Sequence, residues 1–495
     1  MIPSSALSTL EADPAVVYVS PDRSVHHKLA LSAAAINASA AWNAGYKGTG
    51  IGVAILDSGI NSTSDLGGGG GASAIVYTAD YTGAKGTSAG IDAYGHGQHI
   101  AGIIASNGRS STCATCTESF IGVAPGANLL NFRVLDANGQ GSDSQVIAAI
   151  SQAILLKSKY NIRVMNLSLG RPVYESYRQD PLCQAVEAAW KAGIVVVVAA
   201  GNDGRDNTYG TQGYGTITAP GNDPYVITVG AMKTENTPSR SDDLVASYSS
   251  KGPTLLDHVV KPDLVAPGNI IVSLNASGTL TNQYPGNVVS NSVYHSTGGS
   301  TVTSNYFYLS GTSMAAGVVS GAVADLLQAN PKLTPDQVKT LLMMTAYKTF
   351  PTSSSVTDAS TGTVYTSYYD LFTVGAGYLD LGAALAQVSQ IPSSGNALSP
   401  VAVYSSTDNN VVLSYDANSV WANKALWGAK ALWGASAVWS ASELSSVNTA
   451  LGGEKAMWGA DTSTVDGAKA LWGAKALWGA SNMNASESIA ITGEQ

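Results

Sequence analysis

The chain alternates short, nearly continuous apolar runs with longer segments in which apolar residues recur at helical spacing. The runs have the length and composition of strands that are buried on both faces of a parallel sheet. Between them, residues 143–157 and 182–192 carry their apolar side chains on one helical face. This alternation predicts an α/β fold, with a mostly parallel sheet covered by helices on both faces. The predicted strands lie at residues 50–57, 128–134, 164–170, 194–202 and 225–231.

Elements outside this repeat are shorter. Near the beginning of the sequence we expect a strand at 15–19 and a helix within 29–45. Two further helices are expected at 318–329 and 335–345, and Thr334-Pro335 supplies a good N-cap and first-turn pair for the second. The region between the sheet and these helices reads as turn-rich links at 247–253 and 261–268, followed by an insertion at about 275–305.

The composition changes at about residue 391, where a tail begins. This tail holds seven of the nine tryptophans, most of them in a hexad of the type Lys424-Ala-Leu-Trp427-Gly-Ala. A period of six advances about 240° per repeat on an α-helix, so these Trp side chains would form no helical stripe. On a strand, an even period places Trp427 and Trp433 on the same face. We therefore predict short extended segments with Trp as anchors. Hexads, one of them degenerate, begin at residues 424, 430, 436, 455, 469 and 475.

Composition limits the classes of function. A chain of 495 residues, 45% hydrophobic and 12% charged, suits one large domain with appendages. Its formal charge of −9 argues against a nucleic-acid partner. No stretch is apolar enough to predict a membrane span, and residues 1–28 lack the pattern of a signal peptide.

Candidate catalytic groups stand where a parallel sheet would bring them together. Asp57 and Asn202 each end a predicted strand, at the sheet edge where ligands bind in α/β proteins. His96 lies between glycines before a small-residue helix, and Ser313 lies in Gly311-Thr-Ser-Met-Ala at the mouth of another. A serine nucleophile, a histidine base, an orienting acid and an oxyanion donor would account for all four. The alternative is that Asp57 and Asn202 are ordinary turn residues.

The histidines and cysteines also suggest metal chemistry. His96 and His99 lack the further ligands of a zinc site, and a zinc-protease helix would read His-Glu-x-x-His. We therefore interpret His96 as a base and His99 as a packed structural residue. The pair Cys113 and Cys116 suits a local disulfide, half of a metal site or a redox pair, and we favour the disulfide. Cys183 is predicted to be a buried free thiol.

Four motifs together resemble the signatures of subtilisin-like serine peptidases. They occur in the family's order, and the resemblance extends from about Trp42 to Val388. It implies a three-layer α/β/α fold and a serine endopeptidase of broad specificity that acts through an acyl-enzyme. In these roles Ser313 attacks, His96 moves the proton, Asp57 orients His96, and Asn202 helps to hold the oxyanion. The motifs are Asp57-Ser-Gly, His96-Gly-Gln-His99-Ile-Ala-Gly, Ala200-Gly-Asn202 and Gly311-Thr-Ser313-Met-Ala.

The resemblance also implies a mode of substrate binding. A polypeptide substrate would lie extended between two backbone edges, with Ala200 and Gly201 lining the first pocket. No cofactor is required for the chemistry. Asp65 matches a calcium-ligand aspartate of many relatives, but the Cys113–Cys116 segment replaces the loop that completes the site, so the sequence does not favour calcium there. The two edges are Gly139-Gln140-Gly141 and Ser168-Leu169-Gly170.

By the same resemblance we expect three parts in the chain. Residues 1–28 would be the remnant of an inhibitory prosegment, with an ordinary extension as the alternative, and self-cleavage would fall between about Arg23 and Ser32. Residues 29–390 would form the catalytic domain. The tail, 391–495, would either dock on that domain or bind an envelope partner. A secreted or cell-envelope location follows from the family.

The sequence departs from the family pattern at two places near the catalytic residues. After Ser313 the family usually shows Ala-Ser-Pro-His, whereas this chain has Ala315-Ala-Gly317-Val, and Gln98 replaces a small residue between the histidines. The rival hypotheses are an inactive subtilase fold that binds partners through its Trp-rich tail, and a serine-carboxyl peptidase with Glu in place of His. The filled catalytic positions and the glycine-flanked His96 argue against both.

Overall fold

The computed structural model describes most of the chain between residues 28 and 420, together with residues close to its end. The expected strand at 15–19, most of the expected prosegment and the Trp hexads lie outside the described residues, as does Tyr209. The described ranges are 28–67, 73–208, 210–295, 305–358, 361–391, 395–405, 410–420, 491 and 493–494.

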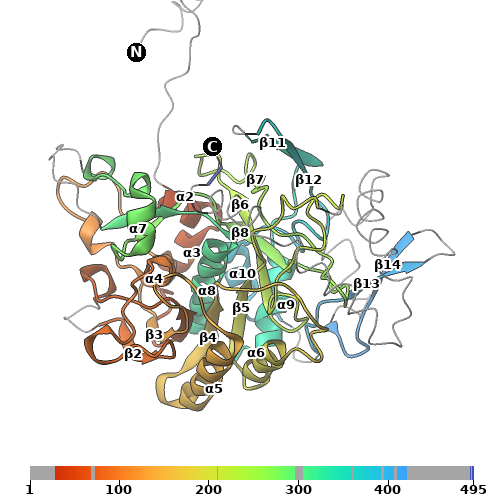
Figure 1. Cartoon of the computed structure of the whole chain (residues 1–495), viewed down its shortest axis with the longest axis horizontal. Helices are drawn as coiled ribbons and strands as arrows, with labels where there is room; N and C mark the ends of the chain where they lie inside the picture. The colour runs from red at the N-terminus through yellow and green to blue at the C-terminus, as the bar shows by residue number, and fades with distance from the viewer. Residues whose placement is uncertain are drawn as a thin grey trace, which may run out of the picture.

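One sheet of eight strands forms the centre of the described structure (Figure 1). Its strands run in the order β2-β3-β1-β4-β5-β6-β7, and β8 also pairs with β6. All neighbours are parallel except β6 and β7. The strands are β1 (Gly52–Asp57), β2 (Ile75–Asp80), β3 (Asn128–Arg133), β4 (Ile162–Leu167), β5 (Val195–Ala199), β6 (Ile227–Lys233), β7 (Leu244–Val245) and β8 (Leu264–Pro267).

Helices cover both faces of this sheet, which confirms the expected α/β/α architecture. Helices α4 and α8 pack together on one face, and α5 and α6 pack together on the other (Figure 1). Strands β1, β5 and β6 are buried along their whole length because both faces are covered. The helices are α2 (Lys28–Ala35), α3 (Ala38–Asn43), α4 (His96–Ala105), α5 (Asp143–Tyr160), α6 (Pro181–Lys191), α7 (Thr279–Gln283), α8 (Thr312–Ala329), α9 (Pro335–Thr345) and α10 (Leu381–Gln387).

Several boundaries differ from the sequence prediction, and three of the differences have clear physical reasons. The helix expected at 29–45 breaks at Asn37, whose φ of 57° is left-handed. Helix α8 begins six residues before the expected position, directly after Gly311. The supposed link at 261–268 contains β8, which pairs with β6 although Pro267 ends it. The apolar pattern could not show these points, because it reports burial and not backbone pairing.

Three small antiparallel pairs were not predicted from the sequence. One pair flanks the insertion, and the other two lie in the segments that follow α9 and α10. The pairs are β9 (Ile271–Leu274) with β10 (Tyr306–Leu309), β11 (Ser353–Thr357) with β12 (Val364–Tyr368), and β13 (Val401–Ser405) with β14 (Asn410–Ser414).

Residues 399 and 402, beyond the composition change, are hydrogen-bonded to the rest of the described structure. The Ser399 N–H donates to the carbonyl oxygen of Pro224 at 3.0 Å, and the Ala402 N–H donates to that of His258 at 2.8 Å. Residues 395–420 therefore continue the fold beyond the composition change near 391. In the described part of the chain, no helix has the length and hydropathy needed to cross a bilayer.

A fully buried ionic network joins the sheet to α9. Asp263 lies 2.7 Å from the ammonium of Lys261 and 3.1 Å from that of Lys339, and none of the three side chains is exposed. The Lys339 ammonium also donates to the carbonyl oxygens of Pro224 and Val226. Each buried charge thus has an opposite charge and hydrogen bonds that offset its desolvation.

We predict that Asp263→Ala lowers the free energy of unfolding by about 3–5 kcal/mol, because two lysines lose their buried counter-ion. Asp242→Ala, at an exposed position, serves as the control and should change stability by less than about 0.5 kcal/mol. Urea unfolding followed by circular dichroism measures both. Equal midpoints for the two variants would refute this role for the network.

Candidate active site

Asp57 lies at the carboxyl end of β1. This strand lies between β3 and β4, at the point where the order of the strands in the sheet changes direction. The Asp57 side chain is only 1% exposed. Its Oδ1 accepts hydrogen bonds from the Ser58 N–H at 2.7 Å and from the Ser58 hydroxyl at 3.3 Å. These donors keep the buried carboxylate in one orientation.

His96 is the first residue of α4 and faces that carboxylate. Its Nδ1 lies 2.8 Å from Oδ1 and 3.0 Å from Oδ2 of Asp57. Since an ionised carboxylate only accepts hydrogen bonds, Nδ1 carries the proton, which leaves Nε2 as the basic nitrogen. Burial by itself lowers the pKa of His96, but the charge and hydrogen bond of Asp57, with the charge of Asp92, raise it above its usual value.

Gly97 allows this close approach. A Cβ at Gly97 would lie 2.4 Å from the Gly59 carbonyl oxygen and 3.1 Å from the Asp57 Cβ. The Gly97 N–H donates to the Ser58 hydroxyl at 2.9 Å. Any larger residue would therefore push the first turn of α4, and His96 with it, away from Asp57.

Asp92 is a supporting residue to which the sequence analysis assigned no role. Its Oδ1 accepts from the N–H groups of Tyr94 and Gly95, and its Oδ2 accepts from the Gln98 N–H at 2.7 Å. The buried carboxylate thus caps the first turn of the helix that presents His96. An aspartate shortly before the expected start of a helix was the available signal.

Ser313 is the second residue of α8, at the amino end of the helix. The preceding Gly311 has a φ of 151°, a conformation that favours glycine. The Ser313 side chain is 9% exposed, and its hydroxyl donates to the Ser168 carbonyl oxygen at 3.2 Å. Among the described residues, no hydrogen bond joins this hydroxyl to His96. A turn about the Ser313 Cα–Cβ bond is needed to redirect it.

Asn202 follows β5 and faces the same helix end. Its Oδ1 accepts from the N–H of Thr312 at 3.0 Å and from the Thr312 hydroxyl at 3.1 Å. This orientation leaves its amide Nδ2 without a hydrogen-bond partner among the described residues. The Thr312 hydroxyl also accepts from the Gly201 N–H at 3.1 Å, so Thr312 positions the whole turn. In the sequence, the position of Thr312 next to Ser313 in the motif was the only signal that Thr312 would have this role.

The two expected substrate-binding edges differ in how many of their backbone groups are already hydrogen-bonded within the protein. Leu169 and Gly170 make no backbone hydrogen bond to any described residue, while the Ser168 hydroxyl donates to the Ser313 carbonyl oxygen. At the other edge, Gly139 and Gln140 lie in a turn closed by Asp136. At this edge, Gly141 is the one residue whose backbone N–H and carbonyl both lack a hydrogen-bond partner among the described residues.

Comparisons with known proteins identify the family to which this chain belongs. The family model described as Subtilase family matches residues 48–376, more than half of the chain. The chain belongs to the subtilase family of serine peptidases. It is 40% identical to Serine protease AprX of Bacillus subtilis over 304 residues, which cover 60% of this chain and 61% of AprX. The match thus spans less than two thirds of AprX.

Other relatives of this subtilase include Subtilisin E of Bacillus subtilis. It is 33% identical over 345 residues, which cover 69% of this chain and 73% of Subtilisin E. Among solved structures, Sphericase is similar with a TM-score of 0.46 and 28% identity, over 61% of this chain and 84% of that one.

Asp65 of this subtilase is engaged within the protein. Its carboxylate is 1% exposed and accepts from the Ser110 N–H at 2.7 Å and from the Tyr306 hydroxyl at 2.5 Å. Within the described ranges, no cluster of three His, Cys, Asp or Glu residues includes it. Both carboxylate oxygens of Asp65 are thus engaged with donors from the protein itself.

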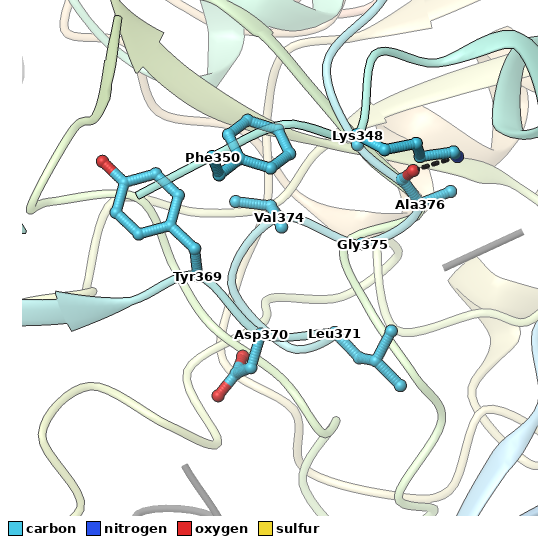
Figure 2. Close-up of a pocket in the computed structure, with 9 residues that line it drawn as sticks. Lys348, Phe350, Tyr369, Asp370, Leu371, Val374, Gly375 and Ala376 are labelled. Atoms are coloured by element: carbon cyan, nitrogen blue, oxygen red, sulfur yellow. Dashed lines mark hydrogen bonds between the residues drawn. The ribbon is translucent and has the colours of Figure 1, made fainter. Parts of the chain in front are cut away.

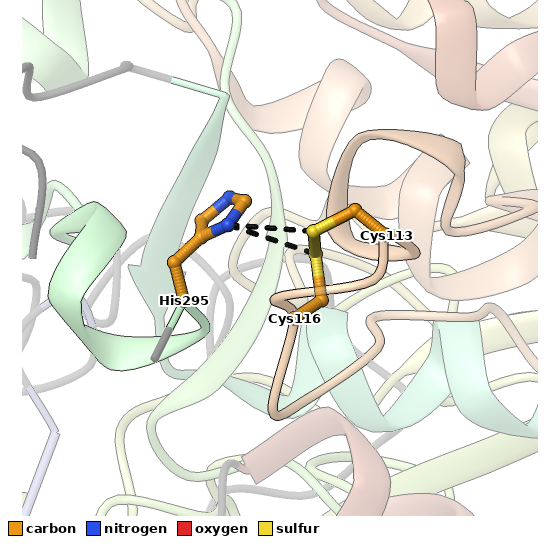
Figure 3. Close-up of side chains that lie close together, drawn as sticks. All are labelled: Cys113, Cys116 and His295. Carbon is orange, nitrogen blue, oxygen red and sulfur yellow. Dashed lines mark hydrogen bonds between the residues drawn. A yellow bond between two sulfur atoms is a disulfide. The ribbon is translucent and has the colours of Figure 1, made fainter. Parts of the chain in front are cut away.

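The cluster of potential ligands that the described residues do contain is Cys113, Cys116 and His295 (Figure 3). The two sulfurs form a disulfide, which confirms the favoured interpretation, and the His295 Nδ1 lies 3.5 Å and 3.7 Å from them. A disulfide offers no thiolate to a metal.

Two further predictions are confirmed. Cys183 is a buried free thiol, and burial raises its pKa. His99 is fully buried, and its Nε2 lies within hydrogen-bond distance of the carbonyl oxygens of Ile271 and Phe307. Burial lowers the pKa of His99 to about 3, so it stays neutral and structural.

A pocket is lined by one segment that follows α9 and one that follows β12 (Figure 2). The residues that line it come from 348–350 and 369–377, and none belongs to the catalytic motifs. The Lys348 ammonium donates to the carbonyl oxygens of Met343 and Ala376. Burial lowers the pKa of Lys348 to about 7. The pocket is thus unrelated to the Asp57–His96 pair.

Gly97→Ala should reduce kcat/KM by about 10²-fold, because the added Cβ would displace His96 from Asp57. Gly286→Ala is the matched control, since a Cβ there meets nothing within 4 Å. Hydrolysis of a chromogenic peptide measures both variants. If Gly97→Ala kept its rate within twofold of the parent, the close approach at Gly97 would not matter for activity.

Proposed function

We propose that this subtilase is an endopeptidase in which Asp57, His96 and Ser313 hydrolyse peptide bonds through an acyl-enzyme. The observation that carries the proposal is the 2.8 Å contact between His96 Nδ1 and the buried Asp57 carboxylate, made at the sheet edge that α8 also reaches with Ser313. A buried carboxylate in this position fixes the imidazole tautomer and stabilises the imidazolium formed during the reaction.

In the proposed mechanism, the Ser313 hydroxyl turns from Ser168 toward His96 Nε2 and attacks the substrate carbonyl carbon. His96 takes the hydroxyl proton and then gives it to the leaving amine, which frees the first product. Water, deprotonated by the same nitrogen, hydrolyses the acyl ester and restores Ser313.

Two donors are proposed to hold the oxyanion. The Asn202 amide is oriented by the Thr312 contacts, so its Nδ2 is available. The Ser313 N–H belongs to the first turn of α8, where backbone N–H groups lack helical partners and the helix dipole favours negative charge. Donors fixed before the reaction begins stabilise the tetrahedral intermediate without reorganising.

Polypeptides are the proposed substrates, bound as an extended strand. The unpaired backbone groups of Leu169, Gly170 and Gly141 suit pairing with a substrate backbone, and Ala200 and Gly201 would border the first pocket. Recognition through the main chain depends little on side chains, which supports broad specificity.

We further propose that the protein is a self-processed precursor that acts outside the cytoplasm. The Cys113–Cys116 disulfide suits an oxidising environment, and the subtilisin relatives fit a secreted enzyme. Residues 1–28 would be the prosegment remnant and residues 29–390 the catalytic domain. No cofactor enters the chemistry, and structural calcium at Asp65 is not proposed.

The test is hydrolysis of a chromogenic peptide. Ser313→Ala should abolish the activity, and Asn202→Ala should lower kcat by about 10²–10³-fold. Ser151→Ala, on the exposed face of α5, should retain the parent rate. Equal rates for the parent and Ser313→Ala would overturn the proposal in favour of a binding protein.

The pH dependence follows from the state of His96. The base must be neutral, so kcat/KM should rise with pH through a midpoint above the usual histidine value of about 6.5. Removing the Asp92 charge withdraws one cause of the raised pKa, so Asp92→Asn should move the midpoint to lower pH. Rate profiles between about pH 5 and 9 test this, with melting temperatures to follow any loss of the helix cap. An unmoved or raised midpoint would contradict the electrostatic role.

A further inference from the structure

Glu494, near the far end of the sequence, is buried against the catalytic domain. Its side chain is only 1% exposed. Its Oε1 accepts from the Arg205 guanidinium at 3.0 Å, from the Ser247 N–H at 2.9 Å and from the Ser247 hydroxyl. The Lys233 ammonium lies 3.8 Å from Oε2. Oε1 thus accepts three hydrogen bonds, whereas the buried Oε2 has no hydrogen-bond partner among the described residues and faces the Lys233 ammonium.

The backbone around Glu494 is held as well. The Glu494 N–H donates to the Asn269 Oδ1 at 2.9 Å, and the Asn269 Nδ2 donates to the Glu494 carbonyl oxygen at 3.0 Å. The Asn287 Nδ2 donates to the Ile491 carbonyl oxygen at 3.2 Å. The Asn269 side chain therefore forms hydrogen bonds with both backbone groups of Glu494, as a neighbouring strand would. Such bonds recognise the main chain of a peptide.

Gly493 adds a steric requirement. Its φ is 79°, in the left-handed region. A Cβ at Gly493 would lie 2.3 Å from the Ile270 Cγ1 and 2.5 Å from the Ser310 hydroxyl oxygen. Both distances are shorter than any normal contact, so this position admits glycine alone. The surface thus selects a glycine followed by a glutamate.

The surface that contacts Glu494 also carries two positive charges, which favour the binding of an anion. Arg205 and Lys233 are 9% and 7% exposed, so water screens their charges poorly. Arg205 has a second carboxylate partner in Asp358, at 3.1 Å, and Lys233 has one in Glu235, at 3.3 Å. Without Glu494, two nearly buried cations would each lose one of their two carboxylate partners.

We infer that Arg205, Lys233, Ser247 and Asn269 form a recognition site for a Gly-Glu peptide, called here the Glu494 socket. Its occupant is the chain's own Ile491–Glu494 segment, bound in cis. The socket adjoins Ser310, whose hydroxyl accepts from the Ile270 N–H at 2.7 Å and which lies three residues before Ser313. Docking therefore places Glu494 close to the start of α8, the helix that contains Ser313. This inference does not rest on the proposed function.

Peptide binding to a truncated chain tests the socket. Both the full chain and a chain ending at residue 490 would carry Ser313→Ala, so that hydrolysis cannot affect the result. The probe is a fluorescein-labelled peptide of residues 490–495 with capped ends, followed by anisotropy. We expect the truncated chain to bind it. Peptides with Gly493→Ala or Glu494→Gln should each bind at least about tenfold more weakly.

The full chain should bind the peptide at least about tenfold more weakly than the truncated chain, because a tethered occupant has a high effective concentration. Binding as tight to the full chain would overturn the inference, and so would absence of binding to a truncated chain that circular dichroism shows to be folded.

A second variant keeps the test decisive if truncation prevents folding. Glu494→Ala in the full chain should open the socket to the peptide and lower the melting temperature by about 4–8 °C. Glu118→Ala is the control, since Glu118 is only partly buried and forms no ion pair with a described residue. It should leave both readouts unchanged. A Glu494→Ala chain that melts like this control and binds no peptide would refute the socket.

Discussion

The close packing of α4 against α8 is the contact on which the active-site geometry depends. One helix begins with His96 and the other presents Ser313 in its first turn, so their crossing sets the spacing between the proposed base and the proposed nucleophile. Gly317 lies at this crossing, where a Cβ would be 3.3 Å from the Ile103 Cγ2. Gly317, which departs from the family pattern after Ser313, thus has a packing role. Because α8 is buried along 16 of its 18 residues, it has no freedom to shift in compensation.

Acidic groups and hydrogen-bond donors lie on opposite sides of the crossing between α4 and α8. The buried carboxylates of Asp57 and Asp92 lie on the His96 side, where positive charge develops when the imidazole takes a proton. The free amide of Asn202 and the amino end of α8 lie on the other side, where the oxyanion would form. The groups on both sides are held in place before substrate arrives, whereas the Ser313 hydroxyl still has to turn away from Ser168.

The insertion and the Cys113–Cys116 loop form a structural unit at the edge of this frame. The Tyr306 hydroxyl donates to Asp65, and the Tyr306 ring lies 4.6 Å from that of Phe120 and 5.4 Å from that of Tyr294, measured between centroids. The Tyr306 hydroxyl thus engages the Asp65 carboxylate, while edge-to-face contacts pack its ring between Phe120 and Tyr294.

The sequence by itself determined the α/β class, the positions of Asp57 at the end of one strand and Asn202 shortly after another, the helix at 335–345 and the structural role of His99, and it favoured the disulfide. These features are local: apolar periodicity reports burial, and the catalytic motifs are short and contiguous. Only the tertiary structure decided that β8 joins the sheet, that Thr312 orients Asn202, and that Glu494 lies against Asn269, 225 residues earlier in the chain. Such contacts join segments far apart in sequence, and their energy depends on burial and charge that exist only once the chain has folded.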